Sequence, residues 1–374
     1  MNRVLFIAGL GLFAVLFGTY LFLFLRRMSK FYRTGGRPPC ATWGAVLLSA
    51  IFVIAAALTR GILLMILLFL TVFGLLTDLL NLIIRLIGKF AHRPFAFWQK
   101  LYRCGVIPVL ITVIVATAGY FNMTTIHRTD YTVESPKLSR NYRIAYLSDL
   151  HFGTTMGTDK LQKIADEISR TSPDMVILGG DITDESTKKE EMTAAFKILG
   201  GIKNNYGCFY VYGNHDRQGY SEKKHFTDTE LQHAIEDAGI VILRDGNYSI
   251  NGELLLIGRE DAGRNGGQRN TIEALTAGTS EDMFRLVLDH QPRDTKEGMM
   301  YGCDLQLSGH THNGQIWPIG YVAALSNDVL YGEKTLGTYR VIVSSGIGGW
   351  GFPVRTEGRS EWVMITLTPQ PSQP

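Results

Sequence analysis

The chain has 374 residues, more than one ordinary domain needs, and its formal net charge is +3. Charged residues make up only 19% of the chain, so neither a basic nucleic-acid-binding surface nor a highly charged disordered tail is indicated. The four cysteines are too few and too scattered for a disulfide framework or a thiolate zinc site. Long apolar runs occur almost entirely in the first third, which predicts a membrane region followed by a soluble domain.

Residues 1–121 contain apolar runs that predict four transmembrane helices. The first run has 22 uncharged residues (4–25), and a helix of about 20 apolar residues crosses the hydrocarbon core of a bilayer. It ends in Arg26-Arg27 without the small-residue site of a cleavable signal peptide, so we expect it to be retained. The other predicted spans are 41–59, 61–84 and 105–121.

The charges between these runs predict the orientation of the protein in the membrane. The loop after the first run and the loop after the third each carry five Lys or Arg residues, whereas the opposite side carries isolated ones. By the positive-inside rule both basic loops are cytoplasmic, so an even number of spans places the C-terminal domain outside the cytoplasm of a multi-pass plasma (inner) membrane protein. Asp78 lies within the third run, where a carboxylate can mark an ion or proton path, can sit at the interface or can cap a neighbour.

Short β-rich runs and helical patterns follow a polar segment, 122–140, which we interpret as a linker. Strands and helices alternate at first and strands then predominate, so the pattern predicts an α/β or α+β domain over 141–367, with a tail at 368–374. Predicted strands are 142–147, 175–178, 208–211, 240–243, 253–258, 284–289, 304–308, 338–345 and 361–367, and predicted helices are 159–170, 190–199 and 229–238.

Five polar clusters follow these strands at their C-terminal ends, where open α/β sheets bind ligands. In chain order they supply Asp149 and His151; Asp181; Asn214, His215 and Asp216; His290; and His310 and His312. Turn formation or helix capping explains one such cluster but not five. Carboxylate, imidazole and amide ligands without thiolates suit Mn, Fe or Zn, and so many ligands favour two ions that share a bridging carboxylate.

The ordered set D-x-H, G-G-D, G-N-H-D, a single His and G-H-T-H resembles the calcineurin-like metallophosphoesterases over roughly residues 140 to 367. The resemblance implies a four-layer α/β/β/α sandwich with the site at the sheet edges. It also implies that Asp181 bridges two metal ions and that His215 lies beside the phosphorus. The implied ligands are Asp149, His151 and His312 for one ion, and Asn214, His290 and His310 for the other.

Two further stretches, GHTHNGQIWPIG and SSGIGGWGFPVR, look like those of the membrane-attached and exported bacterial phosphodiesterase branch. Asn313 departs from the usual glycine after the second histidine, and Ser360 stands where a proline is usual. The first departure is a small change near the metals, and the second is expected to affect local structure more than chemistry.

The implied mechanism is attack on phosphorus by a metal-bridging hydroxide, since two ions about 3.5–4 Å apart lower the pKa of a shared water. His215 would stabilise the developing charge or protonate the leaving oxygen. Asp216 either orients His215 or is a turn residue. Arg355 binds a substrate phosphate or, as the more ordinary reading, forms an ion pair.

The expected function is therefore that of a membrane-anchored two-metal phosphoesterase that hydrolyses a phosphodiester or pyrophosphate in a lipid or cell-envelope substrate. The expected partners are that phosphoester substrate and the lipid bilayer, without nucleic acid, and the oligomeric state is open. One alternative is a UDP-2,3-diacylglucosamine-type lipid-precursor hydrolase, which requires the domain to be cytoplasmic. Another is a catalytically silent membrane binding or transport component.

Overall fold

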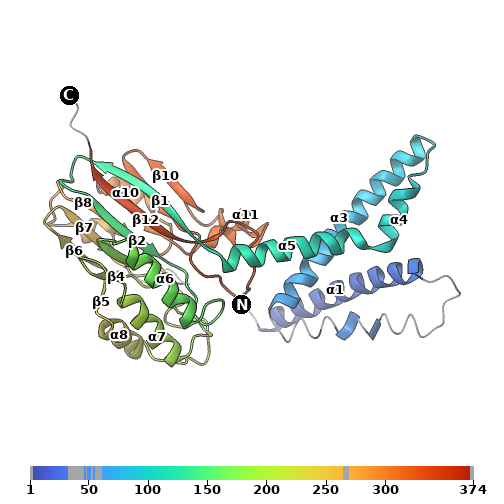
Figure 1. Ribbon diagram of the computed structural model, residues 1–374, viewed down its shortest axis with the longest axis horizontal. Helices are drawn as coiled ribbons and strands as arrows, with labels where there is room; N and C mark the ends of the chain where they lie inside the picture. The colour runs from blue at the N-terminus through green and yellow to red at the C-terminus, as the bar shows by residue number, and fades with distance from the viewer. Residues whose placement is uncertain are drawn as a thin grey trace. The chain divides into compact units, whose positions relative to one another are not determined.

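The computed structural model describes residues 3–32, 46–47, 49–51, 54, 61–263 and 269–370 (Figure 1). It divides into two compact units, Met1–Gly119 and Tyr120–Pro374. The division separates the apolar helices from the domain that carries the polar clusters.

The described part of the first unit is mainly helical, as its apolar sequence predicts. It includes α1 (Arg3–Tyr32), α3 (Ile62–Phe90), α4 (Ala96–Cys104) and α5 (Val106–Thr124), the last of which ends in the second unit. Within the described residues, the stretches Leu63–Phe90 and Val106–Thr124 are long and apolar enough to cross a membrane. The first predicted span, 4–25, lies within α1, whereas most of the second, 41–59, lies outside the described residues.

Asp78 has partners on the neighbouring helix. Arg27 of α1 forms an ion pair with the Asp78 carboxylate on α3, and the Tyr20 hydroxyl donates a hydrogen bond to Asp78 Oδ2 at 3.0 Å. An interhelical ion pair therefore accounts for this carboxylate, which favours the structural interpretation over an ion path.

The second unit is built on two six-stranded mixed sheets. The first has the order β1-β12-β2-β3-β4-β5, in which only β12 and β2 pair antiparallel. Its strands are β1 (Ile126–Ser135), β12 (Ser360–Pro369), β2 (Tyr142–Leu147), β3 (Met175–Leu178), β4 (Cys208–Tyr210) and β5 (Ile240–Ile242).

The second sheet has the order β10-β11-β9-β8-β7-β6, with parallel pairing from β11 to β7 and an antiparallel strand at each edge. Its strands are β10 (Gly332–Leu336), β11 (Tyr339–Val343), β9 (Leu305–Ser308), β8 (Phe284–Leu288), β7 (Leu254–Gly258) and β6 (Gly246–Ile250). The central strands of each sheet are thus parallel, so the C-terminal ends of these strands lie at the same end of the sheet.

Helices lie on both outer faces of this sandwich, because successive side chains of a strand point to opposite faces of its sheet and both faces are apolar. On β2, Ile144 and Tyr146 face the second sheet, whereas Ala145 and Leu147 face the helices. Helices α6 (Thr158–Arg170), α7 (Lys189–Gly200) and α8 (Asp228–Asp237) cover the first sheet (Figure 1). The shorter α9 (Ile272–Thr276) and α10 (Thr295–Met300) lie against the second sheet.

The segment 122–140 is not the linker that its polar composition predicts. Residues 126–135 form β1, which pairs in parallel with β12 along its whole length and buries Val133. The strand reads as polar because it is an edge strand whose alternate residues face solvent. The predicted tail at 368–374 likewise begins inside β12, which ends at Pro369.

Candidate metal centre

The polar clusters converge because each follows the C-terminal end of a strand in the parallel part of a sheet. Strands β2, β3 and β4 carry the Asp149, Asp181 and Asn214 loops, whereas β8 and β9 carry the His290 and His310 loops. The loops are also hydrogen-bonded to one another: the His151 N–H donates to the Asp181 carbonyl at 3.0 Å, and the His310 N–H donates to Asp149 Oδ1 at 2.9 Å. The second of these bonds joins the edges of the two sheets.

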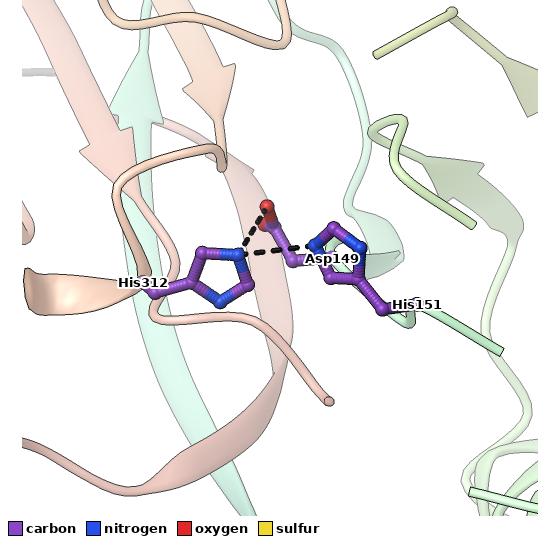
Figure 2. A group of neighbouring side chains, drawn as sticks. All are labelled: Asp149, His151 and His312. Atoms are coloured by element: carbon purple, nitrogen blue, oxygen red, sulfur yellow. Dashed lines mark hydrogen bonds and ion pairs between the residues drawn. The ribbon is translucent and has the colours of Figure 1, made fainter. Parts of the chain in front are cut away.

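One group of potential metal ligands consists of Asp149, His151 and His312 (Figure 2). Their ligand atoms all lie within 4.8 Å of one another, and all three residues are buried. His151 Nε2 lies 3.1 Å from His312 Nε2, which in turn lies 3.5 Å from Asp149 Oδ1. Two imidazole nitrogens and a carboxylate oxygen therefore point at the same small volume, as ligands of a divalent ion would.

A second group consists of Asp181, His290 and His310, again with ligand atoms within 4.8 Å of one another. His290 donates its Nδ1–H to the Gly179 carbonyl at 2.7 Å, and its Nε2 lies 3.1 Å from Asp181 Oδ2. A backbone carbonyl that fixes the far nitrogen of an imidazole is the usual support of a metal-ligating histidine.

Asp181 lies between the two groups. Its Oδ2 atom, 3.1 Å from His290 Nε2 in the second group, is also 3.8 Å from His151 Nε2 in the first. Its Oδ1 atom accepts the His215 N–H at 2.8 Å. The carboxylate is therefore within reach of both ligand sets.

Asn214 lies on the turn that packs against Asp181. A Cβ at Gly213 would come 2.3 Å from Asp181 Oδ1, so only glycine permits this close approach. The amide of Asn214 donates to the Tyr220 hydroxyl at 3.3 Å, whereas its Oδ1 is buried without a hydrogen-bond partner. That oxygen is available as a ligand.

The chemistry of these residues fits divalent metal ions. Three candidate ligands have a buried side-chain atom without a hydrogen-bond partner that can coordinate a metal: Asp149 Oδ2, Asn214 Oδ1 and His290 Nε2. A buried polar atom left unpaired costs about 1–3 kcal/mol, which metal coordination offsets. Burial also lowers the pKa of His310 to about 3, so its imidazole is neutral, as ligation requires.

Five of the candidate ligands adopt a left-handed backbone conformation, which non-glycine residues rarely adopt. The φ angles are +55° at Asp149, +44° at His151, +53° at Asp181, +69° at His310 and +50° at His312. Each costs on the order of 1–2 kcal/mol in an L-residue, and such strain collects where function requires a particular side-chain direction. Asn313 is also left-handed, at +50°, so asparagine serves here in place of the usual glycine.

His215 has a partner that the sequence did not indicate. Its Nδ1 lies 2.8 Å from Glu185 Oε2. Burial opposes protonation of His215, but the hydrogen bond to Glu185 and the charge of Asp181 outweigh it and raise the pKa of the imidazole to about 9. No feature of the stretch Asp-Ile-Thr-Asp-Glu (181–185) distinguishes Glu185 from an ordinary turn residue.

Asp216 does not orient His215, contrary to one interpretation of the G-N-H-D motif. Its buried carboxylate accepts hydrogen bonds from the backbone N–H groups of four residues: Asp181, Ile182, Thr183 and Gly213. The distances are 2.6–3.0 Å. Asp216 therefore holds the Asp181 loop and the Asn214 turn together. The carboxylate beside the His215 ring is that of Glu185, not that of Asp216.

Arg355 is also structural. It is fully buried and donates hydrogen bonds to the His312 carbonyl at 2.8 Å and to the Gly348 carbonyl at 2.7 Å. Its guanidinium therefore holds the loop of His312 in place and is not presented to a substrate phosphate.

Comparison with known proteins agrees with this geometry. Residues 142–314 match the family model of the calcineurin-like phosphoesterases. A transmembrane protein with metallophosphoesterase domain from Danio rerio is 29% identical over 82% of this chain and 71% of its own length. An uncharacterized metallophosphoesterase from Helicobacter pylori is 34% identical over 63% of this chain and 62% of its own, and one from Aquifex aeolicus is 29% identical over 69% and 98%.

The chain spans less than two thirds of the Helicobacter relative, so the similarity identifies a domain and a reaction class and does not identify a substrate. The two His/Asp groups are consistent with the two-metal sites typical of the family. Residues 142–314 thus have the sequence of a calcineurin-like phosphoesterase domain, and transmembrane metallophosphoesterases are among the relatives of the chain. The match and the two His/Asp groups agree with a metallophosphoesterase, a hydrolase that acts on phosphoric ester bonds.

Proposed function

We propose that the protein is a membrane-anchored phosphodiesterase of the membrane-attached and exported bacterial branch, and that it cleaves a phosphodiester or pyrophosphate in a lipid or cell-envelope substrate. The observation that carries this proposal is the position of Asp181 between two groups of buried His and Asp side chains. A carboxylate within reach of both groups suits a site for two ions rather than one.

In this proposal Asp149, His151 and His312 hold one divalent ion, and Asn214, His290 and His310 hold the other, with Asp181 between them. Mn, Fe and Zn all suit such nitrogen and oxygen ligands. Bound at this site, the two ions supply a water of lowered pKa and offset the negative charge of the phosphate. Hydrolysis would add the hydroxyl of a water to phosphorus and break the bond to the leaving oxygen, so the water loses one proton and the leaving oxygen gains one.

His215 is the residue we assign to the leaving oxygen. It lines the same cavity as Asp181 and His310. Because Glu185 engages Nδ1, the other ring nitrogen, Nε2, remains to donate a proton or a hydrogen bond to the substrate. Glu185 keeps the imidazole in the orientation and charge state that this donation needs.

The membrane arrangement remains the one that the sequence predicts: four spans, two basic cytoplasmic loops and a C-terminal domain outside the cytoplasm. The two long apolar helices and the transmembrane relative support attachment to a membrane. A phosphatase or fluorescent reporter fused after Pro374 tests the orientation. A reporter signal that places the C-terminus in the cytoplasm would favour the alternative function, a lipid-precursor hydrolase.

The substitution Asp181→Asn tests the proposed catalytic centre in the full chain. It keeps the size of the side chain but removes the charge shared between the two ligand groups. We expect hydrolysis of bis-p-nitrophenyl phosphate to fall by at least about 1,000-fold, and bound metal, measured by mass spectrometry, to fall as well. The matched control is Asp166→Asn, an exposed aspartate of α6. Retained hydrolysis and metal content in Asp181→Asn would refute the bridging role.

A further inference from the structure

A cavity of about 270 Å³ opens beside the candidate metal centre, and its lining includes both polar and apolar side chains. Asp181, His215 and His310 are among its polar lining residues, which we call the polar wall. Its apolar lining residues, which we call the apolar wall, are Ile316, Ile319, Ala323, Trp350 and Phe352. A phosphoester held at the polar wall would therefore place one of its substituents against hydrocarbon.

The apolar wall continues onto the surface of the domain through the short helix α11 (Ile319–Ala323). No charged residue occurs from Ile316 to Leu325, and Val322 and Leu325 are 68% and 87% exposed. We define the α11 patch by its exposed large apolar side chains, which are Trp317, Ile319, Tyr321, Val322, Leu325 and Trp350. Several large exposed apolar side chains within one short segment are typical of interaction sites, and Trp and Tyr favour membrane–water interfaces.

The patch is a firmly held part of the domain. The Trp317 N–H donates to Thr356 Oγ1 at 2.9 Å, and the Gly320 N–H donates to Glu357 Oε2 at 3.0 Å. The Gln315 amide donates to the Trp350 carbonyl at 3.0 Å. Both sides of the patch are therefore tied to one loop, residues 349–360, so its apolar side chains stay exposed without collapsing into the core.

The loop 349–360 is also hydrogen-bonded to the start of the second unit, where the chain leaves the candidate span α5. At this entry, the Asn122 amide donates to the Arg355 carbonyl at 3.3 Å, and Ser360 Oγ donates to the Met123 carbonyl at 3.0 Å. Only Thr125 separates the end of α5, at Thr124, from the start of β1. The α11 patch thus belongs to the part of the domain that is attached directly to the end of an apolar helix.

We propose that the α11 patch docks into the bilayer surface and that the apolar wall of the cavity receives the hydrocarbon chain of a lipid phosphoester from that bilayer. The phosphate of the lipid then lies at the polar wall, between the candidate metal ligands and His215. This inference rests on the proposed phosphodiesterase activity and specifies its substrate class. The occupant of the patch is lipid because the patch is uncharged, contains interfacial aromatic residues and is bonded to the loop 349–360, which also contacts the chain at Asn122 and Met123.

The first test compares two substrates of the full chain in lipid nanodiscs supplied with Mn²⁺. One is bis-p-nitrophenyl phosphate, which is water-soluble, and the other is hexadecyl p-nitrophenyl phosphate, which partitions into the disc. In Val322→Ser/Leu325→Ser we expect kcat/KM for the hexadecyl ester to fall about tenfold or more, with less than a twofold change for the soluble ester. The control, Met299→Ser/Met300→Ser, changes two exposed apolar residues of α10 and should alter neither rate.

An equal loss on both substrates, or no loss on either, would overturn the proposal. Hydrolysis of neither ester by the unaltered chain would refute the proposed phosphodiesterase function instead. The two failures are therefore distinguishable.

A second test does not depend on activity. A nitrobenzoxadiazole fluorophore is attached to Leu325→Cys or to Met300→Cys in a chain that lacks Cys40 and Cys104, and the disc contains spin-labelled lipid. We expect strong quenching at position 325 and little at position 300. Equal quenching at the two positions, or protection of position 325 that rises with protein concentration as a second copy would cause, would contradict bilayer docking.

Discussion

The pairing of Glu185 with His215 makes a quantitative prediction about the proton on the leaving group. Replacing Glu185 with Gln keeps a hydrogen-bond acceptor of the same size beside His215 Nδ1 but removes the negative charge that stabilises the protonated ring. The two side chains are only 25% and 15% exposed, so water screens the interaction weakly.

The expected loss follows from the strength of a hydrogen bond to a charged group, which is about 1.5–3 kcal/mol. Since about 1.4 kcal/mol corresponds to a factor of ten in rate, kcat should fall roughly 10- to 100-fold. The loss should be larger for a diester with a phenolate leaving group than for one with p-nitrophenolate, because the more basic oxygen needs the proton more.

The assay measures kcat for both diesters in the full chain, with Glu190→Gln, an exposed carboxylate of α7, as the matched control. Combining Glu185→Gln with His215→Ala completes a double-mutant cycle, in which we expect no further loss beyond that of His215→Ala. A rate within twofold of the unaltered protein, or fully additive losses in the cycle, would refute the idea that Glu185 acts through His215.

Two further predictions concern stability, measured by urea unfolding of the full chain in detergent. Asp216→Asn places an amide where backbone N–H groups need an acceptor, so the free energy of unfolding should fall by about 3–5 kcal/mol. The exposed control Asp166→Asn should lower it by less than about 0.5 kcal/mol. A small loss in Asp216→Asn would contradict the role of its carboxylate in joining the two loops. Val133→Ala should cost about 1–3 kcal/mol and Thr132→Ala, which faces solvent, almost nothing. Equal effects of the two would mean that the β1 segment is a linker after all.

The sequence predicted the convergence of the site because strand order imposes it. Parallel strands end at a common edge, so polar residues that directly follow β2, β3 and β4 must lie close together, and those after β8 and β9 likewise. The groups that contain Asp149 and Asp181 each combine residues from both sheets, so they also require the packing of one sheet on the other, which strand order does not predict. The resemblance to a known family then divided the predicted ligands into two sets; in the structure Asp149, His151 and His312 lie together, as do Asp181, His290 and His310.

Features that depend on tertiary contacts were not predictable from the pattern. Glu185 lies in a loop whose path no periodicity describes, so its contact with His215 appears only in the folded chain. Asp216 follows His215 directly in sequence, yet its carboxylate is directed at backbone N–H groups of another loop. The composition of the β1 segment predicts a linker because an edge strand with one solvated face has the composition of a loop.

The most direct test of the account is a metal titration of the full chain, because every role assigned to the site depends on two ions. Metal is first removed with a chelator, and Mn²⁺ is then added while bound metal and hydrolysis of bis-p-nitrophenyl phosphate are measured in the same sample. We predict no hydrolysis without metal and full hydrolysis when about two equivalents per chain are bound. Hydrolysis by the stripped protein, or saturation of both binding and rate at one equivalent, would contradict the two-metal centre.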